Sequence, residues 1–262
     1  MRIASYLKSA LVAAGLLVAG FAEAGSLQQV LSRGELRVGI TLAAPWAMRE
    51  DDGELRGFEI EVARKLAADM DVEPVFLRYE HNALIRAIES GEIDLIAAGL
   101  SVTPDRALHV NFSQPYATGG IGIATYTEST AAITQLDELD HPDFAVAVVD
   151  GSVAAEIAER ILPRAQLHKL GDEAAAIDAL VAGLVDIYLE EEPIPQFLAL
   201  EHPGTIDVPV SRPLVETRSA FAVGKGDPDF LAFLNAWIEA READTWLPTT
   251  HQYWFRTLQW RD

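Results

Sequence analysis

The chain has 262 residues, half of which are apolar, and its 40 acidic and 20 basic residues give a formal net charge of −20. The apolar content is typical of a folded protein and excludes a disordered chain, and the length suits two small domains. The acidic balance excludes nucleic acid and anionic membrane surfaces as expected partners, because both attract clusters of Lys and Arg. Without cysteine, the chain forms no disulfide, thiolate metal site or lipid-modified cysteine.

The N-terminal residues predict a signal peptide over 1–24. Arg2 and Lys8 precede an apolar run over 10–21, and Ala22-Glu23-Ala24 follows as an A-x-A cleavage site. The run is shorter than the roughly 20 apolar residues that a membrane-spanning helix needs. We therefore expect cleavage near Ala24 and a soluble, exported protein without a membrane anchor.

Strand and helix patterns alternate along the following segment. Apolar runs predict strands over 36–40, 74–77 and 93–98, and Asp-Asp-Gly over 51–53 predicts a turn. Apolar residues at helical spacing predict a helix over 58–70, and a second apolar stripe through Leu84, Ile85 and Ile88 predicts a short helix that ends at Gly91. Alternating strands and helices favour an α/β fold with a largely parallel sheet and helices on both faces.

The same arrangement recurs in the second half of the chain. In both 88–97 and 180–189, a helix ends at a glycine, and a hydrophobic–Asp pair then leads into an apolar strand. A strand over 144–149 likewise repeats the first strand. Two copies of one α/β unit predict two lobes, with a ligand cleft between them.

The connection between the lobes is expected in the glycine-rich segment 119–123, since a hinge needs an extended and flexible chain. The predicted division is a signal peptide over 1–24, a first lobe over 25–118 and 219–262, and a second lobe over 119–218, which includes the hinge segments. One copy of the repeat then falls in each lobe.

A carboxylate-binding site is predicted just beyond the strand over 93–98. Gly99, Ser101 and Arg106 follow that strand, and in open α/β sheets ligands collect beyond the carboxyl ends of strands. The planar guanidinium of Arg holds a carboxylate through two parallel hydrogen bonds. In a second interpretation, Arg106 only caps a helix or pairs with Asp105 at the surface.

The second lobe offers an anion site and an acid. Ser152 and Val153 open a predicted helix over 154–162, whose N-terminal amides could bind an anion, although Ser152 could serve only as the N-cap. Glu191 lies in a run of three Glu residues after the strand over 186–189 and could pair with a ligand ammonium, unless this run is a solvated loop. An Arg and an acid on opposite sides of a cleft predict a site for a zwitterion.

Two further residues are expected near the cleft, and motifs for catalysis are absent. Trp46 follows the first strand and could contact an apolar part of the ligand or pack in the core. Of the six histidines, none has metal-ligand spacing, and His81 is the one expected near the cleft. Since the chain has no G-x-S-x-G, H-E-x-x-H, P-loop or G-x-G-x-x-G motif, we expect no catalytic residue, metal or cofactor.

Taken together, these segments resemble the family 3 extracellular solute-binding proteins, which are periplasmic amino-acid receptors of bacterial ABC importers. The motifs are G-F-E-I-E-V-A over 57–63, G-L-S-V-T-P-D-R over 99–106 and V-N-F-S-Q-P-Y over 110–116. The resemblance implies a type II periplasmic-binding-protein fold whose two lobes, joined by two hinge crossings, close over a polar amino acid or a derivative. It also implies a monomer that delivers this ligand to the transmembrane subunits of an ABC permease.

The resemblance also implies roles for the candidate residues. Arg106 would bind the ligand carboxylate with the Ser101 hydroxyl and an amide near Ser152 or Val153, and Glu191 would bind the ammonium. Trp46 matches an aromatic position near the cleft. The chain departs from the family in having Glu191 where Asp is usual, Val153 where Thr, Ser or Gly is common, and Ala43 and His81 at positions that often hold aromatic residues. A polar or acidic ligand side chain, reached by His81 or Arg78, is therefore one expectation.

A rival resemblance is to cyclohexadienyl (prephenate/arogenate) dehydratases, which are enzymes on the same scaffold. It rests on His141-Pro142-Asp143 and Glu201-His202-Pro203-Gly204. In this alternative, Glu191 or a neighbour acts as general acid with a pKa raised by burial. A dicarboxylic substrate would need a second cation, for which His81 and Arg78 are the candidates.

Overall fold

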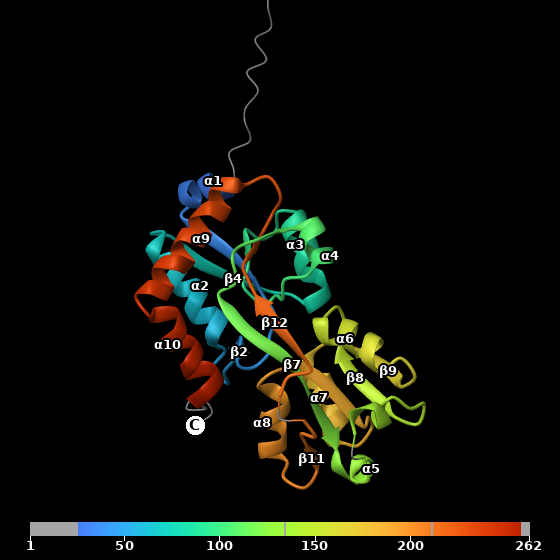
Figure 1. Ribbon diagram of the computed structural model, residues 1–262. Coiled ribbons are helices and arrows are strands. Elements are labelled where there is room, and N and C mark those ends of the chain that lie inside the picture. Colours follow the sequence, from blue (N-terminus) through green and yellow to red (C-terminus); the bar gives the residue numbers. More distant parts are fainter. Residues whose placement is uncertain (1–25, 134, 211, 258–262) are drawn as a thin grey trace, which may run out of the picture.

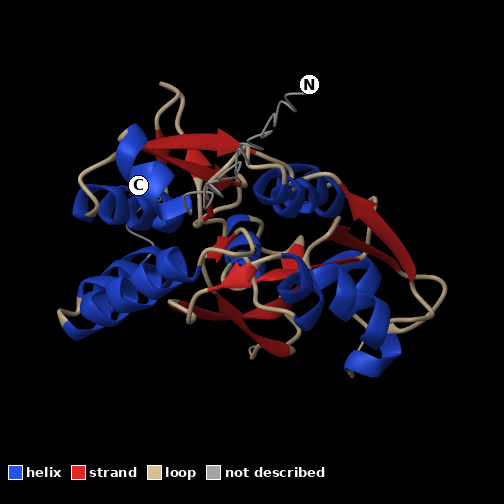
Figure 2. Ribbon diagram, turned by 90° about the horizontal axis from the view of Figure 1, so that it is seen from above, coloured by secondary structure: helices blue, strands red, loops and turns tan. Residues whose placement is uncertain are grey.

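The computed structural model describes residues 26–133, 135–210 and 212–257 (Figure 1). The predicted signal peptide over 1–24 lies outside these residues. Within the described ranges, the helices are all too short or too polar to cross a membrane. The chain forms two separate larger sheets, and helices pack around the strands of both (Figure 2).

The first sheet has the strand order β4-β1-β5-β13-β6. Its strands are β1 (Glu35–Ile40), β4 (Glu73–Arg78), β5 (Leu95–Ile96), β6 (Asn111–Phe112) and β13 (Ala222–Val223). β1 is parallel to β4 and β5, and the antiparallel strands β13 and β6 extend the sheet beyond β5. With this sheet lie α1 (Ser26–Arg33), α2 (Phe58–Asp69), α3 (Leu84–Glu89), α4 (Pro104–His109), α9 (Pro228–Ala243) and α10 (Trp246–Gln252) (Figure 1).

The second sheet has the order β11-β7-β10-β8-β9, with β12 also paired to β7. Its strands are β7 (Ala117–Tyr126), β8 (Ala145–Val149), β9 (Gln166–Leu170), β10 (Ile187–Glu191), β11 (Ile206–Asp207) and β12 (Val215–Ser219). β8 is parallel to β9 and β10, whereas β7 is antiparallel to its three neighbours. Around it lie α5 (Thr127–Thr130), α6 (Val153–Ile161), α7 (Glu173–Val181) and α8 (Ile194–Glu201).

Short elements complete the described chain. They are the hairpin of β2 (Met48–Arg49) and β3 (Leu55–Arg56), the 3-10 helices η1 (His81–Ala83) and η2 (Leu136–Leu139), and a π-helical segment over Tyr253–Thr257. The hairpin confirms the turn predicted at 51–53. The strand predicted over 93–98 is shorter in the structure, where β5 covers only Leu95–Ile96.

Two antiparallel strands, β7 and β12, run from one half of the molecule to the other (Figure 1). The glycine-rich segment 119–123 lies inside β7, and its glycines permit close packing: a Cβ on Gly120 would lie 2.3 Å from the Cβ of Pro213. The predicted boundaries, 118/119 and 218/219, fall within this pair of strands, and the division into lobes at those residues stays a prediction.

The repeat predicted from the sequence is present as structure. Gly91 and Gly183 have φ values of +73° and +66°, which favour glycine, and each follows a helix, α3 or α7. Asp94 Oδ2 accepts a hydrogen bond from the amide of Arg37 at 2.9 Å, and Asp186 Oδ2 accepts one from the amide of Ala145 at 2.8 Å. In both halves the Asp side chain therefore binds the backbone near the start of the neighbouring parallel strand, β1 for Asp94 and β8 for Asp186.

Candidate ligand-binding site

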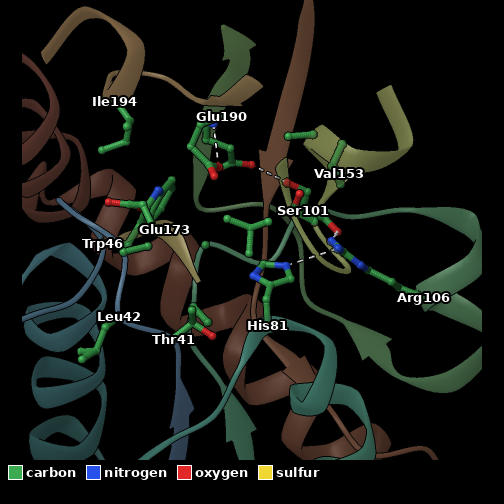
Figure 3. Close-up of a pocket in the computed structure, with 17 residues that line it drawn as sticks. Thr41, Leu42, Trp46, His81, Ser101, Arg106, Val153, Glu173, Glu190 and Ile194 are labelled. Carbon is green, nitrogen blue, oxygen red and sulfur yellow. Dashed lines mark hydrogen bonds between the residues drawn. The ribbon is translucent and has the colours of Figure 1, made fainter. Parts of the chain in front are cut away.

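A cavity lies between the two halves, and all eight candidate residues from the sequence line it (Figure 3). From the first half come Trp46, His81, Gly99, Ser101 and Arg106, and from the second come Ser152, Val153 and Glu191. The other lining residues are Thr41, Leu42, Ala43, Ala98, Val149, Ala154, Glu173, Glu190 and Ile194. The wall is thus mainly apolar, with one cation and three carboxyl groups among the described residues.

Arg106 is buried on α4, so the interpretation of it as a surface residue is wrong: its side chain turns inward, and the residue is only 6% exposed. Thr103, rather than Arg106, caps the helix by accepting a hydrogen bond from the Arg106 amide. The guanidinium donates to the carbonyl of Ser101 at 2.9 Å and, across the cavity, to the carbonyl of Gly151 at 2.7 Å. Arg106 therefore bridges the two halves at the cavity.

A second bridge between the halves joins Ser101 to Glu191. The Ser101 hydroxyl donates to Oε1 of Glu191 at 2.7 Å. Burial raises the pKa of Glu191 to about 7, with a further increase from Glu190, while the bond from Ser101 and the charge of Arg106 act in the opposite direction. The Glu191 carboxyl therefore sits where a positively charged group would hold it ionised.

His81 is neutral in this cavity. Burial, and then the positive charge of Arg106, lower the pKa of His81 to about 3. Its Nε2 lies 3.3 Å from Nη2 of Arg106, and because a guanidinium can only donate, this nitrogen must accept. His81 thus orients Arg106 and adds no positive charge to the site.

Trp46 has both of the roles considered for it. Its ring lines the cavity and also packs edge-on against Phe58 and Phe255, with ring centroids 5.8 Å and 4.6 Å away. Gly99 permits this packing, because a Cβ there would lie 2.9 Å from the Trp46 ring. The sequence did not indicate that Glu59 holds the backbone at Gly99 in place. Its buried carboxylate accepts a hydrogen bond from the Gly99 amide at 2.6 Å.

Ser152 is the N-cap of α6, since its hydroxyl accepts from the amide of Ala155 at 3.1 Å. The Ser152 amide donates to the carbonyl of Val149 at 3.2 Å, so it is already engaged. Val153 is the first residue of the helix, and an amide at that position has no carbonyl partner within its own helix. Of the two amides considered, that of Val153 is the better placed to bind an anion.

The cavity is more acidic than the sequence predicted, because it contains two further Glu side chains and lacks Arg78. Glu173 and Glu190 line the cavity, although the sequence singled out neither. Arg78 does not line it: its side chain is 46% exposed and faces Glu80 at 3.6 Å. Arg78 is therefore excluded as a contact for a ligand in this cavity, whereas His81 lines the cavity as a neutral group, and its contact with a polar ligand side chain stays a prediction. Across the described residues, no group of three or more metal-ligating side chains occurs.

A cavity enclosed between two α/β halves, with two strands passing between them, defines a two-lobed binding protein of the type II periplasmic-binding-protein fold. The sequence pattern of the bacterial extracellular solute-binding proteins, family 3, matches residues 36–257. The chain belongs to this family. It is accordingly a solute-binding protein.

Similar proteins of known name or structure cover nearly the whole chain. The L-cystine-binding protein TcyJ of Escherichia coli (strain K12) is 26% identical over 243 residues, which are 92% of this chain and 90% of TcyJ. The crystal structure of the ancestral amino acid-binding protein AncCDT-1, a precursor of cyclohexadienyl dehydratase, has a TM-score of 0.82 at 28% identity and covers 89% of this chain and all of its own. A putative ABC-transporter binding component from Wolinella succinogenes DSM 1740, complexed with lysine, has a TM-score of 0.81 at 26% identity, covering 87% of this chain and 99% of that one.

Proposed function

We propose that this protein binds one free α-amino acid between its two halves and delivers it to the transmembrane subunits of an ABC importer. The observation that carries this proposal is that Arg106 and Glu191 reach one cavity from opposite halves and meet through Ser101. Their opposite charges match the carboxylate and the ammonium of an amino acid. The amino-acid-binding proteins among the similar proteins support the same function.

In this proposal the ligand replaces the bonds that now join the halves. Its carboxylate accepts from the Arg106 guanidinium, the Ser101 hydroxyl and the Val153 amide. Its ammonium donates to Glu191, which then stays ionised. Trp46 and Gly99 shape the wall against which the ligand packs. Since both halves contact the ligand, its binding favours the closed form, which is the form that a permease would recognise.

Location and assembly follow as parts of the proposal. Residues 1–24 act as a signal peptide that is removed near Ala24, and the protein then works in the periplasm. It acts as a monomer, because one chain supplies every residue of the site.

The dehydratase alternative has less support from the site. The pKa of Glu191, raised to about 7 by burial, would suit a general acid. A dicarboxylic substrate, however, would meet the carboxyls of Glu173 and Glu190 and would find a second cation neither in Arg78 nor in His81. We therefore propose binding without chemical conversion.

Titration calorimetry with a panel of amino acids tests this function. We expect tight binding of one class of amino acid, and a loss of at least about 100-fold in Arg106→Ala, because a paired charge-assisted contact is removed. Arg86→Ala, which removes an exposed Arg on α3, should stay within about twofold of the wild type. The proposal fails if no amino acid binds, or if prephenate or arogenate binds instead and is converted to an aromatic product.

A further inference from the structure

Two carboxyl groups in the cavity remain without a role once a zwitterion is bound to Arg106 and Glu191. Glu190 is held in place by its own half: Oε1 accepts from the Glu191 amide at 2.8 Å, and Oε2 accepts from the Tyr188 hydroxyl at 2.9 Å. Glu173 is less well satisfied. Its Oε1 accepts a long bond of 3.4 Å from the Ala44 amide of the other half, and Oε2 has no hydrogen-bond partner among the described residues.

Glu173 lies at the opposite side of the cavity from Arg106 (Figure 3). It is the first residue of α7, where the positive end of the helix dipole favours an ionised carboxylate. Part of its side chain faces the cavity, and the carboxyl group is otherwise enclosed by the surrounding walls. An acid at this place is therefore directed at whatever fills the cavity.

The charges of the cavity are unbalanced for a ligand with no net charge. Among the described residues that line the cavity, Glu173, Glu190 and Glu191 face Arg106 as the one cation, since His81 is neutral. Burial, and then the charge of Glu190, raise the pKa of Glu173 well above its ordinary value, and burial likewise raises that of Glu190. Two neighbouring buried carboxyls must either keep a proton or receive a cation, and a ligand can supply that cation.

We propose that the ligand is a basic amino acid, and that Glu173, with Glu190 beside it, binds the cationic end of its side chain. This inference rests on the proposed function, because it takes the ligand backbone to be bound at Arg106 and Glu191. The side chain then runs from there toward Glu173, along a wall that includes Leu42, Trp46 and Ile194. Such an apolar wall suits the methylene stem of a basic side chain.

The test compares each basic amino acid with an uncharged ligand of similar shape, by titration calorimetry of the wild type and of variants. The pairs are lysine with norleucine and arginine with citrulline. Glu173→Gln removes the charge and keeps an acceptor for the Ala44 amide. Asp178→Asn is the matched control, because it removes the same charge from an exposed position on the same helix.

We expect the wild type to bind a basic ligand about 10- to 100-fold more tightly than its uncharged counterpart, the range for one charge-assisted hydrogen bond. In Glu173→Gln this preference should disappear through weaker binding of the basic ligand, with the uncharged ligand changed by less than about threefold. Asp178→Asn should keep the preference. If Glu173→Gln does not fold, Glu190→Gln provides the same comparison.

The inference is overturned if norleucine and citrulline bind the wild type as tightly as lysine and arginine. It is also overturned if Glu173→Gln weakens all ligands equally, because the residue would then act only through the Ala44 contact. In both results amino acids still bind, so the proposed function survives. If no amino acid binds the wild type at all, the proposed function itself fails.

Discussion

Asn82 Nδ2 donates a hydrogen bond to Oδ2 of Asp150 over 2.8 Å, and this bond joins the two halves outside the cavity. Asn82 lies in η1 of the first half, and Asp150 follows β8 of the second. The backbone is equally close here: Gly151 has a φ of +75°, and a Cβ on it would lie 2.8 Å from the Cβ of Asn82. The contact therefore forms only when the halves approach each other as they do in this structure.

Asn82→Ala should lower the affinity for every ligand by a similar factor, because it weakens the closed form without changing the cavity wall. An exposed hydrogen bond contributes about 0.5–1.5 kcal/mol, which corresponds to a roughly two- to tenfold weaker affinity. We expect the loss in the dissociation rate, measured by stopped-flow fluorescence. A double-mutant cycle with Asp150→Ala isolates the pair, and additive effects would show that the bond does not contribute to closure.

Glu59 makes the stability of the protein depend on pH. Its side chain is fully buried and accepts hydrogen bonds from the Gly99 amide and the Tyr116 hydroxyl. Burial raises the pKa of Glu59 to about 7 from 4.5, although both hydrogen bonds favour the charged form. Between these values the folded state holds a proton that the unfolded state has lost, so the free energy of unfolding falls as pH rises from 4.5 to 7.

Glu59→Gln should remove this share of the pH dependence. As pH rises from the lower to the higher pKa, the free energy of unfolding of the variant should increase relative to that of the wild type by about 1.4 kcal/mol per pH unit. The total change should be up to about 3 kcal/mol. Urea unfolding at several pH values measures the difference. Glu239→Gln, an exposed change on α9, should follow the wild type. Parallel pH profiles for Glu59→Gln and the wild type would mean that Glu59 does not titrate in this range.

Asp94 and Asp186 occupy equivalent places in the two halves, but Asp94 should matter more for stability. Both accept a bond from a strand amide, and Asp94 alone also pairs with the guanidinium groups of Arg33 and Arg37. Asp94→Ala leaves two partly buried cations without their partner and should cost about 2–3 kcal/mol, against about 1 kcal/mol for Asp186→Ala. Urea unfolding measures both, and equal losses would assign the stabilisation to the shared amide bond alone.

Much of the fold could be predicted from the sequence because its signals are local. Gly91 and Gly183 end helices through positive φ values, and Asp94 and Asp186 follow them at the same spacing. The apolar spacing of α2 likewise marked the residues that face the core. Glu59 interrupts that pattern, and its burial depends on Gly99 and Tyr116, which lie about forty and sixty residues further along the chain. No local pattern indicates such a partner.

The site was predictable where a strand end carried a distinctive side chain. Arg106, Ser101 and Glu191 were recognised in this way, and the structure brings them to one cavity. Glu173 was missed because an acid in the first turn of a helix is common and usually solvated. Its place in the cavity depends on how closely the halves approach, since its hydrogen bond reaches the Ala44 amide 129 residues earlier. The distance between the two halves cannot be inferred from one sequence.

The most direct measurement is titration calorimetry with the amino acid that binds best, its carboxamide, and its analogue without the α-amino group. If Arg106 and Glu191 bind the two charged groups of the ligand, the carboxamide should bind at least about 100-fold more weakly, and the deaminated analogue at least about tenfold. Binding of the carboxamide within about threefold of the parent amino acid would contradict recognition of a ligand carboxylate by Arg106.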